Sequence, residues 1–84
     1  MHNLAMAENL LNVVLSEAAK HEGKRIQRIS VVLDDHDFAE AEAMQFCFEA
    51  MAVGTQAEGA LMDISRSDNG VESSLPSIVL QLSQ

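Results

Sequence analysis

The segment RIQRISVVL, residues 25–33, decides the fold, because it predicts a β-strand between two helical segments. Ile29, Val31 and Leu33 alternate along it and share one face. The other face carries polar residues such as Ser30. This alternation and the β-branched composition are typical of a strand with one buried side. The strand therefore predicts a sheet that is covered on one face.

Helical patterns lie on both sides of this strand. Apolar residues recur at helical spacing over residues 4–21 and predict a first helix that is ended by Gly23. After the strand, Asp37 is followed three residues later by Glu40, which resembles a capping box with Asp in place of Ser or Thr. We therefore expect a second helix over residues 37–53.

The second predicted helix is apolar around most of its circumference. Its apolar residues form two adjoining stripes, Ala41, Met44, Phe48 and Met51 on one and Ala39, Ala43, Phe46, Ala50 and Val53 on the other. Such a helix is either deeply buried or half covered by a partner. A chain of 84 residues has little material for burying both stripes. Association with another protein or a second copy of the chain, as a homodimer, is therefore expected.

Two further strands complete the predicted fold. Residues 60–64 alternate, with Ala60, Met62 and Ile64 inward, and residues 78–82 form a last apolar run. Between them, residues 65–76 are rich in turn-forming residues and predict a linker. We expect a single α+β domain over residues 1–84, with two helices packed on a three-stranded mixed sheet in the order α-β-α-β-β and an antiparallel last strand.

Composition excludes several classes of function. The formal net charge of -8 and a pI near 4.5 argue against binding to nucleic acid or to an anionic membrane surface, because both need clustered cations. Cys47 is the single cysteine, so this chain contains neither an internal disulfide nor a thiolate zinc site. No signal peptide, membrane span or catalytic motif is recognisable. We therefore expect a cytoplasmic protein that is not an enzyme.

The first two residues carry donors for a metal ion. The Met1 amine and the His2 amide nitrogen close a five-membered chelate ring, and that amide with the His2 ring closes a six-membered one. Nitrogen-rich donor sets of this kind suit Ni(II) and Cu(II). A His in second position also occurs without any metal, so the pair alone leaves both interpretations open. His36, between acidic neighbours, is a second candidate ligand, or else an exposed residue at the start of a helix.

Four segments together resemble a known family. They are Met1-His2-Asn3, Leu4-Ala-Met-Ala-Glu-Asn-Leu-Leu11, Phe46-Cys-Phe-Glu49 and Gly54-Thr-Gln-Ala-Glu-Gly59. The chain resembles the HypA/HybF family of hydrogenase nickel-insertion proteins from Met1 to about Ile64. The resemblance implies a metallochaperone that delivers Ni(II) to the precursor of a [NiFe]-hydrogenase large subunit, and in some organisms to urease. It also implies a nucleotide-hydrolysing maturation partner and a nickel site that uses the Met1 amine and His2.

The chain departs from this family in two places. Asn3 stands where the family usually has Glu, so only the Asn3 backbone is expected as a donor. Glu40 falls at a commonly acidic position and is a further candidate nickel ligand, with helix capping as its alternative role. The two CxxC pairs that the family carries between the second and third strands are missing, so no zinc is expected. The chain therefore resembles the nickel-binding lobe alone.

Two other functions remain open from the sequence. One is a metal-free interaction module that keeps the fold and the partner surface of the family, which the broad apolar face of the second helix favours. The other is an oligomer with a mainly structural role. Nickel binding, capture of a client protein and oligomeric state distinguish these alternatives.

Overall fold

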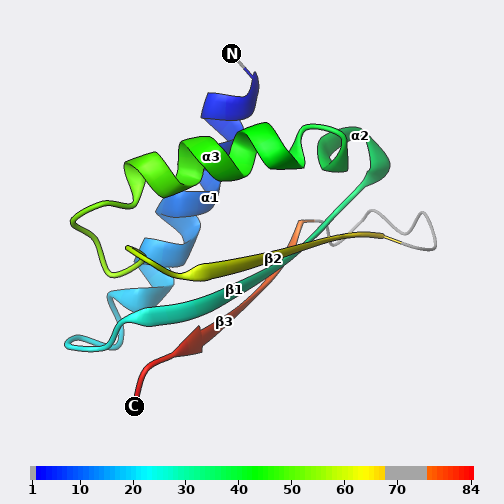
Figure 1. Ribbon diagram of the computed structural model, residues 1–84. Helices are drawn as coiled ribbons and strands as arrows, with labels where there is room; N and C mark the ends of the chain where they lie inside the picture. The colour runs from blue at the N-terminus through cyan, green and yellow to red at the C-terminus, as the bar shows by residue number, and fades with distance from the viewer. Residues whose placement is uncertain (1, 68–75) are drawn as a thin grey trace.

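The computed structural model describes residues 2–67 and 76–84, and these form an α+β fold (Figure 1). The elements in chain order are α1 (His2–Ala18), β1 (Ile26–Leu33), α2 (Asp35–Phe38), α3 (Ala41–Met51), β2 (Leu61–Arg66) and β3 (Ser77–Leu82). The predicted fold class is confirmed. Most of the predicted linker, residues 68–75, lies outside the described residues, and Ser65 and Arg66 belong to β2.

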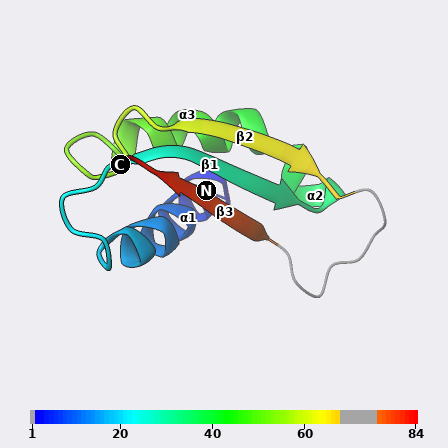
Figure 2. The ribbon, with the colours of Figure 1, turned by 90° about the horizontal axis from the view of Figure 1, so that it is seen from below.

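The sheet is mixed, as predicted, and β1 is its central strand. Figure 2 shows the three strands side by side in the order β2-β1-β3. β2 runs parallel to β1 and β3 runs antiparallel to it. The register places Val31 opposite Ile64 on one side and Ile78 on the other. This pairing lines up apolar side chains from all three strands against the helices, because cross-strand partners point to the same face.

An irregularity in β1 adds one buried side chain that alternation does not predict. Ile26 and Ile29 are both buried, although they are three positions apart. In a regular strand they would point to opposite faces. The pairing with β3 shifts between Ile26 and Arg28, which marks a β-bulge. A bulge inserts one residue and restores the inward direction, so both isoleucines reach the core.

The second helix is not continuous, which corrects the prediction over residues 37–53. α2 is a separate short helix, and α3 begins after a turn at Ala39 and Glu40. The cap is Asp34, whose Oδ1 accepts a hydrogen bond from the Asp37 backbone N–H at 2.7 Å. The Glu40 side chain makes no capping bond, so the predicted capping box is wrong. The backbone of Asp34 is extended where it follows β1, and the N-cap therefore lies three residues earlier than expected, at Asp34 instead of Asp37.

α1 begins and ends before the predicted bounds. It starts at His2 rather than Leu4, and it ends at Ala18, before His21. Gly23, with φ of +84°, follows in the turn that leads to β1. Within the described part of the chain, no helix has the length and apolar character needed to cross a membrane.

The core lies between the helices and one face of the sheet. Its buried members are Ala7, Leu10, Leu11, Val14, Ala18, Ile26, Ile29, Val31, Leu33, Met44, Phe48, Ala52 and Ala57. The helices α1 and α3 also contact each other directly. Of the two stripes predicted on the second helix, the one with Met44 and Phe48 faces inward. The other stays exposed, with Phe46 at 74% and Val53 at 66%.

Candidate metal centre

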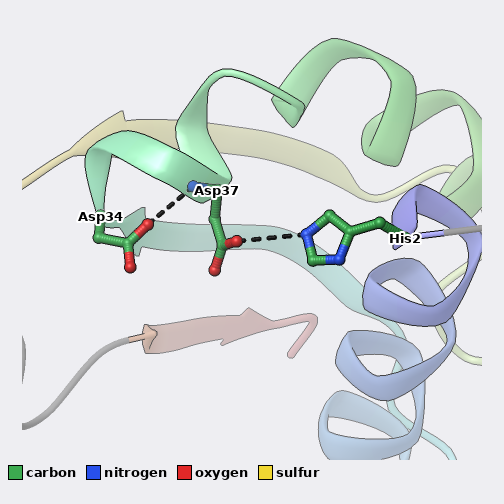
Figure 3. Close-up of polar contacts among 3 residues, drawn as sticks. All are labelled: His2, Asp34 and Asp37. Carbon is green, nitrogen blue, oxygen red and sulfur yellow. Dashed lines mark hydrogen bonds and ion pairs between the residues drawn. The ribbon is translucent and has the colours of Figure 1, made fainter.

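His2 is the first residue of α1, and its side chain reaches toward α2 (Figure 3). Its Nε2 atom lies 3.3 Å from Oδ1 of Asp37. The two residues are 35 positions apart in sequence. They meet because α1 packs on α3, while α2 directly follows the end of the central strand β1.

His36 joins these two residues. The ring centroids of His2 and His36 are 5.9 Å apart. One donor atom each from His2, His36 and Asp37 lies within 4.8 Å of the others. Both histidines are exposed and Asp37 is half-buried, so the cluster is accessible from solvent. Imidazole nitrogens and a carboxylate oxygen are ligands of borderline divalent metals, which gives this cluster the chemistry of a metal site.

α2 holds its two members of the cluster in place. The Asp34 carboxylate binds the Asp37 backbone N–H, which fixes the turn on which His36 and Asp37 stand. The Nε atom of Arg66 lies 3.5 Å from Oδ1 of Asp35, and the Arg66 guanidinium lies over the Phe38 ring. In residues 2–67 and 76–84, the ion pair of Asp37 is with His2. The Asp37 carboxylate is therefore directed at the start of α1 and not at an arginine.

The backbone at the start of α1 leaves nitrogen donors free. The first four N–H groups of an α-helix have no acceptor within the helix. His2 and Asn3 are the first two residues of α1, so a metal bound to their amide nitrogens breaks no helical hydrogen bond. The positive end of the helix dipole disfavours a cation there. Deprotonated amides and the Asp37 carboxylate supply negative charge that opposes this effect.

The Asn3 side chain is turned into the protein. Its Oδ1 atom is buried and has no hydrogen-bond partner among the described residues. Because protein atoms cover this oxygen, the role predicted for Asn3 depends on its backbone nitrogen. Met1 lies outside the described residues, so its predicted role as a ligand stays a prediction.

The structure brings together residues that are separate candidates in the sequence. His2 and His36 were independent candidates, and the fold places their rings side by side. Asp37 was expected as a helix cap, with a cation site of His36 and its acidic neighbours as the alternative, and it is the carboxylate of the cluster. Glu40 is not one of the cluster's three residues, and its role as a ligand stays a prediction. The acidic segment that contains His36 was the only signal in the sequence for Asp37 as a ligand.

A comparison with protein families identifies the chain's relatives. Residues 1–72 match the family model described as "Hydrogenase/urease nickel incorporation, metallochaperone, hypA". The chain belongs to the HypA family. This confirms the resemblance seen in the sequence. The family consists of metallochaperones for hydrogenase and urease, and this confirms the prediction that the chain is not an enzyme.

Curated relatives named hydrogenase maturation factor HypA match about three quarters of the chain. The protein of Methylocella silvestris is 39% identical over 64 residues, which cover 76% of this chain and 57% of the relative. That of Chlorobium limicola is 38% identical, covering 76% and 55%. That of Methanopyrus kandleri is 33% identical, covering 76% and 45%. The chain thus spans about half the length of the curated relatives that it matches.

Proposed function

We propose that this HypA family member binds Ni(II) as cargo at the start of α1 and helps to insert it into a [NiFe]-hydrogenase precursor, or into urease where that is the client. The observation that carries the proposal is the position of His2 at the exposed start of α1. Its amide there has no helical acceptor, and its ring faces a carboxylate. Nitrogen donors that close small chelate rings suit Ni(II).

The proposed nickel ligands are the Met1 amine, the His2 amide and imidazole, and the Asn3 backbone nitrogen, with Glu40 as a further donor. The proposed partners are the hydrogenase large-subunit precursor and a nucleotide-hydrolysing maturation protein. The chain would do this as a single nickel-binding domain without a cysteine-bound zinc site, in keeping with its one cysteine. Binding must remain exchangeable, because a metallochaperone has to release its cargo.

The proposal is tested by adding four glycines ahead of Met1, because a single added residue would place the histidine third and create a new chelate of amine, two amides and imidazole. The addition converts the amine into an amide and displaces the first chelate ring, so we expect nickel affinity to fall by about tenfold or more, equivalent to roughly 1.4 kcal/mol. Isothermal titration calorimetry with Ni(II) measures the change. The matched control carries four glycines after Gln84 and keeps the native affinity. Equal affinity for both extended proteins would contradict an N-terminal chelate.

A second candidate function is a metal-free interaction module. The outer apolar stripe of Ala39, Ala43, Phe46, Ala50 and Val53 favours it, because Phe46 and Val53 are large side chains left in water. In this function the stripe binds the hydrogenase large-subunit precursor, and the N-terminus has no part in capture.

A pull-down with purified precursor separates the two functions. If the stripe binds the precursor, Phe46→Asp abolishes capture and His2→Ala leaves it intact, because a charge in a desolvated interface is costly. Asn12→Asp, which adds the same charge on the exposed side of α1, is the matched control. Capture that survives Phe46→Asp would exclude the stripe as the binding surface.

A further inference from the structure

The two ring nitrogens of His2 face different partners. In the chelate at the N-terminus, only Nδ1 closes a six-membered ring with the His2 amide nitrogen, because Nε2 lies on the far side of the imidazole. Nε2 is therefore left outside that chelate. In the structure Nε2 is the atom that lies 3.3 Å from Asp37 Oδ1 (Figure 3). His2 thus presents an unused nitrogen to the part of α2 that carries His36 and Asp37.

We propose that His2, His36 and Asp37 form a metal-binding site made of side chains alone, which takes a borderline divalent ion such as Ni(II) or Zn(II). Bonds of about 2.1 Å to nitrogen and oxygen hold the donors of one ion about 3 to 4 Å apart. The donor atoms of the three residues already lie within 4.8 Å of one another. Small rotations of the exposed imidazoles are enough to bring them to bonding distance. This site needs neither a free amine nor a backbone nitrogen.

The contacts around the cluster favour a metal site over a simple ion pair. An ion pair between His2 and Asp37 is accessible to solvent and contributes little to stability. It also gives no role to His36, whose ring lies 5.9 Å from that of His2. A shared cation uses all three side chains. Asp35, next in the chain, lies by contrast within ion-pair distance of Arg66 and outside the cluster.

The site has one fixed side and one movable side. His36 and Asp37 stand on a turn that Asp34 caps at 2.7 Å, directly after the central strand. His2 is at the exposed end of α1. Three protein ligands facing solvent leave coordination positions for water or for a receiving group. An ion held in this way ties the start of α1 to α2 and stays open to exchange.

The experiment uses the full chain with four glycines added ahead of Met1, so that the amine no longer closes a chelate ring with the His2 amide. Calorimetric titrations with Ni(II) and with Zn(II) are each expected to show one bound equivalent. His36→Ala and Asp37→Asn, made in this background, should each weaken binding by about tenfold or more. Both variants keep the fold, because the Asp34 cap uses the Asp37 backbone. The matched controls, Asp35→Asn and His21→Ala, keep the affinity of the parent.

The outcomes separate this proposal from the N-terminal chelate. Unchanged affinity in His36→Ala overturns it, as does an extended protein that binds no metal. A loss in Asp37→Asn that occurs only with the native N-terminus also overturns it, and assigns Asp37 to orienting the His2 ring by a hydrogen bond. If the extended and native proteins bind equally and both depend on His36, the side-chain site stands and the N-terminal chelate fails.

Discussion

Replacing Phe48 by alanine is expected to lower the free energy of unfolding by roughly 3 to 5 kcal/mol. Phe48 is only 2% exposed and belongs to the core between the helices and the sheet. Its removal takes away a large buried apolar surface and leaves a cavity that the neighbours fill only in part. At about 0.05 to 0.15 kcal/mol per residue, a chain of 84 residues has little stability beyond this loss. Urea denaturation followed by circular dichroism measures the change.

Phe46→Ala is the matched control, because it makes the same chemical change on the same helix. Two positions on an α-helix are about 200° apart, so Phe46 points away from the core when Phe48 points into it. Phe46 is 74% exposed. We expect Phe46→Ala to change the free energy of unfolding by at most about 0.5 kcal/mol. Equal losses in both variants would contradict the orientation of α3 described above.

The second large effect is expected for His2→Ala, in the binding of Ni(II). His2 is the one residue shared by the proposed N-terminal chelate, through Nδ1, and the proposed side-chain site, through Nε2. Adding four glycines ahead of Met1 removes the first site only, and His36→Ala removes the second only. His2→Ala should weaken both, with a fall in nickel affinity of about a hundredfold, or roughly 2.8 kcal/mol. Calorimetric titration of the protein with its native N-terminus measures it.

His21→Ala provides the comparison for a histidine lost elsewhere. His21 is exposed and lies beyond the other end of α1, outside the cluster. The His21→Ala variant should bind nickel as the native protein does. His2→Ala and His21→Ala should both keep nearly native stability, because both side chains are exposed. Native affinity in His2→Ala would leave neither proposed site standing. The interaction module would then be the better account of the chain.

The regular part of the fold was predictable from periodicity. The alternation of Ile29, Val31 and Leu33 predicted the inward face of β1, and the structure buries all three. The spacing of Met44 and Phe48 predicted the inward stripe of α3. Each pattern follows from local geometry, two residues per repeat in a strand and 3.6 in a helix, so it is visible in the residues themselves.

The start of the second helical region was not predictable in the same way. Asp34 and Asp37 are both suitable caps, and the sequence pattern favoured Asp37 because Glu40 follows it. Which aspartate caps the helix depends on where β1 ends. In the structure β1 ends at Leu33, and the backbone of Asp34 is still extended. The strand's last pairings with β2 and β3 therefore decide which aspartate caps. That decision also frees the Asp37 carboxylate to face His2.

The sequence by itself determined that donors for a metal stand at the N-terminus. Met1 and His2 are adjacent, so their chelate rings depend on covalent geometry alone. It also determined that a single cysteine excludes a thiolate zinc site within this chain. Only the tertiary structure decided that His2 meets Asp37 and His36, 35 and 34 positions away in the chain. No local sequence pattern predicts that these residues lie close together in space. Their proximity depends on how α1 packs against α3 and on where β1 ends and α2 begins.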